Sequence, residues 1–430
     1  MIDWQSLSEK QRAEALQRPI MPDNEKLQAA VAEIIQSVRD SGDDALQVLT
    51  KRFDGIILDK FKVTQTEIES AIQSLDPRVL AAIDEASLMI HRFHVVQLQE
   101  DIEVETKPGV KCSLRIRPLQ AVGLYVPGGR TPLVSTALML GIPAQLAGCP
   151  RIILLSPPDH TGQMAPEIIY AASKCGIDSL FKVGGAQAIA AMAFGTESIP
   201  AVDKIFGPGN RYVTEAKRQV SQTQGLVGID MPAGPSELLI IADGTAKARF
   251  IAADLLSQAE HGPDSQVILL ATDVPLIKKI EIEISAQLTK LPRRKIATEA
   301  LRHARFILVS NIREALKLSN CYAPEHLILN MENAESYLDE VHNAGSIFLG
   351  PWSPESAGDY ASGTNHVLPT YGAARFTDSL SLKDFQKRST VQHLTREGLD
   401  SLGETIMLLA EREGLTAHKH AITLRLEDLS

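Results

Sequence analysis

The feature that most constrains the fold is a repeating pattern that begins at Ala121. Short apolar runs alternate there with amphipathic stretches, which is typical of strand-helix repetition around a mainly parallel sheet. A Pro/Gly-rich joint at 231–236 divides the pattern into two series of similar design. The expected strands of the first series are 121–126, 152–155, 179–183 and 204–206, and those of the second are 238–241, 266–271, 306–310, 326–329 and 346–349.

These two series predict an α/β protein with two tandem, open, mainly parallel-sheet domains. The length of 430 residues agrees, because it exceeds what one ordinary core accommodates. Before the sheets, apolar residues recur at helical spacing in 24–41 and 77–94. The expected division is a helical N-terminal segment at 1–105, α/β domains at 106–235 and 236–380, and a small helical C-terminal tail at 381–430 that docks on another part of the molecule or on a partner subunit.

The composition excludes several classes of protein. Hydrophobic residues make up 44% and charged residues 22%, as in soluble globular proteins. The formal net charge is −10 and no basic run is interleaved with aromatics, which argues against a nucleic-acid partner. The N-terminus lacks the features of a secretory signal, and the most apolar window, 131–148, is too short and too polar to span a membrane. Four widely spaced cysteines without a C-x-x-C pair indicate buried thiols in a reducing cytoplasm.

Glycine-rich loops follow three of the expected strands, at 125–129, 183–187 and 206–210. In an open α/β sheet, ligands bind outside the carboxyl ends of the strands, where glycine lets the backbone approach a phosphate beside a helix N-terminus. The loops together favour a nucleotide site. None of them has the G-x-G-x-x-G spacing, so spacing alone does not identify a dinucleotide, and ordinary tight turns are the alternative for each loop.

Potential metal ligands stand at the end of a helix that Gly262 and Pro263 terminate. Gln258 and His261 are separated by three positions and therefore leave the same helix face. A capped surface helix, with a histidine at its negative end, is the alternative interpretation.

Further candidates lie in a polar loop at 353–366 and in the C-terminal tail. Asp359 and His366 are the candidate ligands or bases of the loop, with a mobile surface loop as the alternative. Glu413 and His418 of the tail would ordinarily be solvated. A mixed nitrogen and oxygen set suits zinc, although an amide oxygen is an uncommon zinc ligand. The set in question is Gln258, His261, Asp359 and His418.

Glu325 and His326 place a carboxylate beside an imidazole where a loop enters a strand. Adjacent residues of an extended segment point to opposite faces, so both serve one site only if the loop turns them inward. Beside a substrate, His326 could move protons at neutral pH and Glu325 could activate water. A solvated pair at a strand edge is the alternative.

Several long motifs, taken together, resemble those of the histidinol dehydrogenase family. The resemblance covers the chain nearly end to end, and no motif position departs from the family pattern. His420 beside His418 leaves one local ambiguity about which imidazole binds. The motifs are 123–129, 206–210, 257–262, 323–327, 358–366 and 416–419.

The resemblance implies a zinc- and NAD-dependent enzyme that oxidises L-histidinol to L-histidine through L-histidinaldehyde, with two NAD+, in the last steps of histidine biosynthesis. It implies incomplete Rossmann-like domains and a cytoplasmic homodimer in which the tail of one subunit completes the site of the other. The family motifs also imply the role of each residue. One zinc per subunit would be held by Gln258, His261, Asp359 and His418, and the substrate would contact these ligands together with Ser236, His326 and Glu413. NAD would contact Tyr125, Gln187 and Asn210, and the catalytic residues would be Glu325 and His326.

Two other classes remain open from the residues alone. A zinc hydrolase would use Glu325 as its base and the glycine loops only as turns. It would need no NAD+ and would form no NADH. A non-enzymatic scaffold, suggested by the polar tail, would bind no metal and turn over no substrate.

Overall fold

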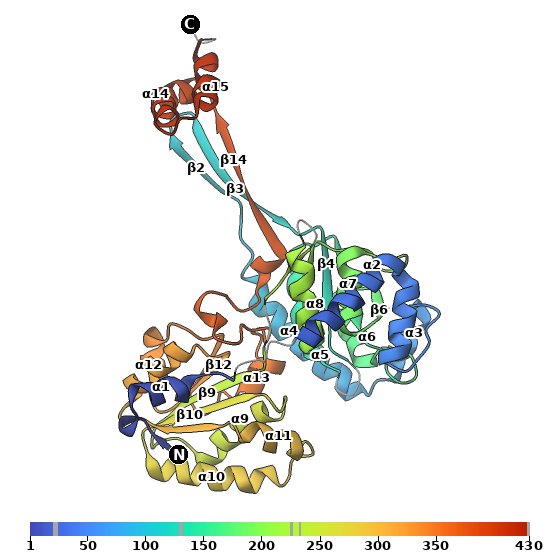
Figure 1. The fold of residues 1–430 in the computed structure, drawn as a ribbon, viewed down its shortest axis with the longest axis vertical. Coiled ribbons are helices and arrows are strands. Elements are labelled where there is room, and N and C mark those ends of the chain that lie inside the picture. The colour runs from blue at the N-terminus through green and yellow to red at the C-terminus, as the bar shows by residue number, and fades with distance from the viewer. Residues whose placement is uncertain (20–24, 129–131, 224–226, 232–233, 428–430) are drawn as a thin grey trace.

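The computed structural model describes residues 1–19, 25–128, 132–223, 227–231 and 234–427. Asn24 of the expected first helix, Gly129 of the first glycine loop, and Pro232 and Ala233 of the joint lie outside the described residues. Two helix-covered sheets form the body, and a slender arm that carries the C-terminus projects from it (Figure 1). Among the helices of the described residues, none combines the length and apolar character needed to cross a membrane.

The first sheet is parallel throughout and has the order β6-β5-β4-β7-β8. Every residue of its central strand β4 is buried because helices cover both faces. Its strands are β4 (Ala121–Tyr125), β5 (Arg151–Ser156), β6 (Leu180–Lys182), β7 (Lys204–Phe206) and β8 (Gly228–Ile229), and its helices are α5 (Val134–Leu146), α6 (Pro166–Lys174), α7 (Gly185–Phe194) and α8 (Arg211–Gln222).

The second sheet is also parallel and has the order β1-β11-β10-β9-β12-β13. Its central strands are apolar and fully buried, as expected of a sheet covered on both faces. Its strands are β1 (Ile2–Asp3), β9 (Glu237–Ala242), β10 (Gln266–Ala271), β11 (Arg305–Leu308), β12 (His326–Asn330) and β13 (Ser346–Leu349), and its helices are α9 (Ala248–Ala259), α10 (Val274–Leu288), α11 (Arg294–Leu301), α12 (Ile312–Tyr322), η2 (Ala334–Glu340) and α13 (Glu355–Tyr360).

The two sheets share one topology, which confirms the predicted tandem of related open sheets. In each, the first strand of the series (β4 or β9) is followed by two strands on one side, and the chain then crosses to the other side. This order is that of the dinucleotide-binding fold without its last strand. The crossing creates a switch point between β4 and β7 in the first sheet and between β9 and β12 in the second.

The N-terminal segment is helical, as predicted, but it is divided between the two sheets. β1 adds an edge strand to the second sheet, and Trp4 packs in that sheet's core. α2 packs against α7 and α8, and α4 packs against α5 and α6 of the first sheet. The helices are α1 (Glu9–Leu16), α2 (Glu25–Phe53), α3 (Gln65–Ser74) and α4 (Pro77–Val95), with a short 3-10 turn η1 (Trp4–Ser6).

The arm is an antiparallel sheet of order β14-β3-β2, capped by two helices at its far end (Figure 1). Helices α14 and α15 agree with the predicted helical tail, whereas strand β14 within it was not predicted. Its sequence is polar and mostly exposed, so it lacks the apolar alternation that reveals a strand. The elements are β2 (Ile102–Lys107), β3 (Val110–Pro118), β14 (Gln386–Leu394), α14 (Arg396–Arg412) and α15 (Thr416–Glu427). The 3-10 turns η3 (Ala373–Arg375) and η4 (Leu382–Phe385) precede β14 in the chain.

Candidate active site

A cavity of about 200 Å³ lies where the two sheets face each other. The first sheet contributes its carboxyl edge, through the loop Gly207–Gly209 that follows β7. The second sheet contributes its amino edge, through the starts of β9 and β12 and the end of α9. Seven candidate residues from the sequence line this cavity: Ser236, Gln258, His261, Glu325, His326, Asp359 and His366.

Gln258 and His261 stand at the end of α9, as the glycine and proline after them predicted. Gln258 is fully buried, yet neither atom of its side-chain amide has a hydrogen-bond partner within the described residues. A buried amide without a partner is costly, so this amide is suited to a ligand in the cavity. The side chain of His261 is half exposed, but desolvation by the surrounding residues lowers its pKa, which favours the neutral imidazole that a metal requires.

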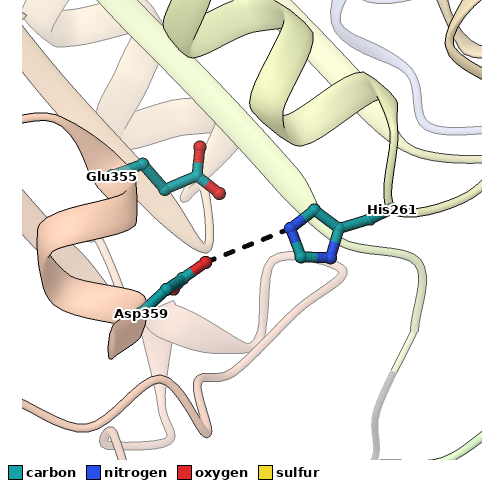
Figure 2. A group of neighbouring side chains, drawn as sticks. All are labelled: His261, Glu355 and Asp359. Atoms are coloured by element: carbon teal, nitrogen blue, oxygen red, sulfur yellow. Dashed lines mark ion pairs between the residues drawn. The ribbon is translucent and has the colours of Figure 1, made fainter. Parts of the chain in front are cut away.

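Asp359 faces His261 across the cavity (Figure 2). Its Oδ2 lies 4.0 Å from His261 Nε2, and Glu355 completes a cluster whose possible ligand atoms lie within 4.8 Å of one another. Asp359 was expected in a loop but belongs to the short helix α13. Glu355 was not assigned a role from the sequence. Its spacing of four positions from Asp359, which places both carboxylates on one helix face, is the signal that could have found it.

His326, the first residue of β12, is surrounded by acceptors. Its Nδ1 donates to the carbonyl of Glu237 at 3.1 Å, so its Nε2 faces the cavity, 3.6 Å from Asp359 Oδ1. Nε2 has no hydrogen-bond partner in the described part of the chain. Burial lowers the pKa of His326, but the carboxylates of Glu355, Glu325 and Asp359 outweigh burial and raise it to about 10.

The side chain of Glu325 points inward beside that of His326, as is required if both residues act in one site. Its Oε2 accepts a hydrogen bond from the backbone N–H of Glu237 at 2.7 Å and lies 3.7 Å from His326 Nδ1. Burial raises the pKa of Glu325 and that of Glu355 to about 8, although His326 opposes the effect in both. Three carboxyl groups therefore surround one imidazole, and a divalent cation in the cavity would favour their ionised forms. Imidazole, carboxylate and amide oxygen donors fit such an ion.

His366, a candidate ligand or base from the sequence, has both ring nitrogens occupied. Its Nδ1 donates to the backbone carbonyl of Asp359 at 3.0 Å, and its Nε2 accepts from Thr136 Oγ1 at 2.9 Å. His366 therefore links α5 of the first sheet to α13, and it has no free nitrogen for a metal or a substrate proton.

The glycine loop after β7 is held from behind by a buried ion pair. Lys217 Nζ donates to the carbonyl of Gly207 at 2.9 Å and pairs with Asp230, which accepts from the N–H of Gly207 at 2.7 Å. Gly207 has φ +121°, and a Cβ there would lie 2.0 Å from the carbonyl oxygen of Tyr125, so only glycine fits. Lys217 and Asp230 were not found from the sequence.

The residues proposed to contact NAD lie at the carboxyl edge of the first sheet. Tyr125 is buried at the end of β4, and its hydroxyl accepts from the N–H of Gly185 at 3.1 Å. Gln187 is buried in α7, while Asn210 is exposed and caps α8 through its side-chain oxygen. The cavity, as the described residues outline it, includes none of the three, so their contact with a nucleotide stays a prediction.

Glu413 and His418 are far from the cavity of their own chain. Both are exposed, on the loop between α14 and α15 and at the start of α15, at the far end of the arm (Figure 1). Within one chain the structure therefore brings together three of the four proposed zinc ligands and leaves His418 apart.

The fold and cavity define an α/β enzyme. On one side of the cavity lies the carboxyl edge of a parallel sheet, where such folds bind nucleotides, and on the other side lies a cluster of potential metal ligands. The sequence model of the family described as histidinol dehydrogenase matches residues 17–426. The chain is 55% identical over 428 residues to the histidinol dehydrogenase of Colwellia psychrerythraea, covering 100% of this chain and 99% of that relative. It is 54% identical over 429 residues to that of Vibrio vulnificus, with 100% and 99% covered.

The fold agrees with these relatives. The crystal structure of histidinol dehydrogenase from Elizabethkingia anophelis matches with a TM-score of 0.96 at 48% identity, covering 100% of this chain and 98% of that one. The chain therefore belongs to the histidinol dehydrogenase family. It is an NAD-dependent oxidoreductase of histidine biosynthesis, as the sequence motifs indicated.

Proposed function

We propose that the chain catalyses the zinc-dependent, four-electron oxidation of L-histidinol to L-histidine through L-histidinaldehyde, with two NAD+. The observation that carries this proposal is the buried amide of Gln258, which lacks a partner among the described residues and stands beside His261 and Asp359. Glu325 and His326 line the same cavity. One cavity thus offers both ligands for a cation and groups that move protons.

One zinc ion per subunit would be held by Gln258, His261 and Asp359, with His418 of a second subunit as the fourth ligand. The bound ion would supply a divalent positive charge that coordinates the nitrogen atoms of histidinol and offsets the buried carboxylates. The zinc would not change its redox state. Ser236 from the cavity and Glu413 from the arm would contact the substrate. These assignments follow the family motifs, and the cluster of His261, Glu355 and Asp359 supports them.

His326 is the proposed base of both oxidations. Its Nδ1–H stays bonded to the carbonyl of Glu237. A cation in the cavity would offset the carboxylates that raise the His326 pKa, so that a deprotonated Nε2 would accept the hydroxyl proton of the substrate when the carbinol carbon loses hydride. The carboxylates of Glu325 and Glu355 stabilise the imidazolium that forms. NAD+ would supply the hydride acceptor in each oxidation.

Glu325 is the proposed base for the step between the oxidations. Its carboxylate would take a proton from the water that adds to the aldehyde carbon, while the imidazolium of His326 would give its proton to the carbonyl oxygen, which yields the hydrated aldehyde and a neutral His326. Burial raises the pKa of Glu325 to about 8, so its carboxylate is a stronger base than an exposed one but acts only in the ionised form, which a cation in the cavity would favour. His326 Nε2 would then accept a hydroxyl proton of the hydrate during the second oxidation, and retention of the aldehyde in the cavity between the two steps would limit its side reactions.

NAD would lie at the carboxyl edge of the first sheet, in contact with Tyr125, Gln187 and Asn210. The N-termini of α7 and α8 open onto this edge and favour the negative charge of a pyrophosphate.

A homodimer with shared sites explains the arm. It holds His418 away from the body of its own chain, and it exposes apolar side chains that a second subunit would cover. Leu408, Leu409, Leu415 and Leu424 are 54%, 59%, 43% and 50% exposed. We place this dimer in the cytoplasm, where its four free cysteines would stay reduced.

The test is to supply the purified protein with L-histidinol and NAD+ and to count the NADH formed per histidinol consumed. We expect two NADH per histidinol, loss of activity with a chelator, and recovery with zinc. One NADH per histidinol would contradict the four-electron reaction, and full activity in the chelator would contradict the metal. Substrate hydrolysis without NADH would favour a zinc hydrolase.

A further inference from the structure

A buried ion pair lies directly behind the candidate active site and joins the start of β9 to the chain after α1. Arg18 Nε and Nη2 donate to Glu237 Oε1 and Oε2 at 2.5 and 2.8 Å. The Glu237 side chain is fully buried and that of Arg18 is 12% exposed. The guanidinium also lies 3.8 Å from the centroid of the Tyr322 ring. Because a buried two-point pair has one favourable geometry, it fixes the two segments against each other.

The backbone of Glu237 holds both side chains of the proposed catalytic pair. Its N–H donates to Glu325 Oε2 at 2.7 Å, and its carbonyl accepts from His326 Nδ1 at 3.1 Å. The orientation of the carboxylate and the tautomer of the imidazole therefore depend on where this one peptide segment lies. Arg18 anchors the side chain of the same residue.

Two strained residues are bonded to the same ion pair. Ala323 and Tyr371 have φ angles of 54° and 58°, in the left-handed backbone region that residues other than glycine rarely adopt. Arg18 Nη2 donates to the carbonyl of Ala323 at 3.2 Å, and the N–H of Tyr371 donates to Glu237 Oε1 at 3.2 Å. Strained backbone persists only where its surroundings hold it. Ala323 lies two positions before Glu325, so this strain is stored beside the proposed catalytic pair.

We propose that the Arg18–Glu237 ion pair positions Glu325 and His326 for catalysis, with Arg18 and Glu237 acting as positioning residues. Their side chains act through the backbone of β9 and through the turn at Ala323. The N-terminal segment that carries Arg18 thereby takes part in the activity of a cavity that none of its described residues lines. This inference rests on the proposed roles of Glu325 and His326.

The test compares steady-state kinetics and zinc content of Arg18→Met, Arg18→Lys and Glu237→Gln. We expect Arg18→Met and Glu237→Gln to lower kcat by at least about tenfold, because displacement of catalytic groups by about 1 Å costs up to about 10²-fold. KM for NAD+ and zinc content should stay within about twofold of wild type, because the side-chain hydrogen bonds of the ion pair, as far as the structure describes the chain, go to Ala323 and Tyr371. Arg18→Lys keeps the charge but not the two-point geometry, so its kcat should lie between those of wild type and Arg18→Met.

Arg12→Met is the matched control. Arg12 lies in the same N-terminal segment, packs on the Trp4 ring and donates to the Trp4 carbonyl, remote from Glu237. It should lower thermal stability at most and leave kcat unchanged.

Wild-type kcat in the Arg18 and Glu237 variants would overturn the inference, as would equal losses in Arg12→Met and Arg18→Met. If Arg18→Met does not fold, Arg18→Lys and Glu237→Gln decide by the same criteria. If His326→Asn is inactive while the Arg18 variants are fully active, only this inference is contradicted. If His326→Asn is active, the proposed function is contradicted.

Discussion

The two sheets have the same strand order but present opposite edges to the cavity. The first offers its carboxyl edge, where the N-termini of α7 and α8 provide positive dipole ends beside the glycine loop at Gly207. The second offers its amino edge, where the C-terminal end of α9 and the starts of β9 and β12 carry carboxylates and imidazoles. A helix C-terminus favours a cation. Strand order alone therefore does not decide which edge of an open sheet becomes a site.

The comparison predicts that changes at the two edges alter different kinetic constants. Variants at the amino edge of the second sheet should lower kcat, because they affect proton transfer and the substrate. Variants at the carboxyl edge of the first sheet should raise KM for NAD+.

The largest expected effect is that of His326→Asn. Loss of the proton acceptor should lower kcat by roughly 10²- to 10⁴-fold, the usual contribution of a general base, while zinc content stays normal. Steady-state rates and metal analysis measure both. His342→Asn, at an exposed position, is the matched control and should behave as wild type. Undiminished turnover in His326→Asn would remove the base from the account.

Glu325→Gln should separate the two halves of the reaction. The amide cannot accept a proton from water, so single-turnover assays should show the step from aldehyde to acid slowed by about 10²-fold and the first oxidation slowed less. Glu335→Gln, exposed on η2, serves as the control. Equal slowing of both halves would assign Glu325 a different role.

Asp230→Asn addresses the other sheet. The substitution removes the charge that pairs with buried Lys217 behind the glycine loop, so KM for NAD+ should rise by about tenfold while kcat changes less. Thermal unfolding should show a loss of stability as well. The exposed Asp339→Asn should leave KM unchanged. A fall in kcat with a constant KM would break the proposed separation between the two edges.

Subunit mixing tests whether the arm completes the second sheet's site. Inactive His418→Ala and His261→Ala variants, mixed in equal amounts and allowed to exchange subunits, should recover about a quarter of wild-type activity. Half of the dimers are then mixed, and one of the two sites in each has all its ligands. Failure to recover activity in verified mixed dimers would contradict the shared site.

Most of the sheet framework was predictable, because buried parallel strands are apolar runs of the right length. β7, β10 and β13 coincide with their predicted ranges. The arm was not predictable, since β3 pairs with β14 across more than half of the chain and β14 is polar. Local hydrophobic patterns in the sequence do not reveal which distant segments pair as strands.

The cavity residues on recognisable motifs were also predictable, and seven of them meet in one place. Glu355 was missed because its loop was not expected to form a helix. Arg18, Lys217 and Asp230 were missed because each acts through a partner distant in sequence, as in the pairs Arg18–Glu237 and Lys217–Asp230. Charges that pair only after folding resemble ordinary solvated charges in a sequence.

The most direct test of the account is a crystal structure with zinc, L-histidinol and NAD+, with anomalous scattering measured at the zinc edge. The account predicts one zinc peak per cavity, bound by Gln258, His261 and Asp359 at the amino edge of the second sheet, with the nucleotide along the carboxyl edge of the first. A zinc peak away from these three side chains, or a nucleotide bound at the second sheet, would contradict it.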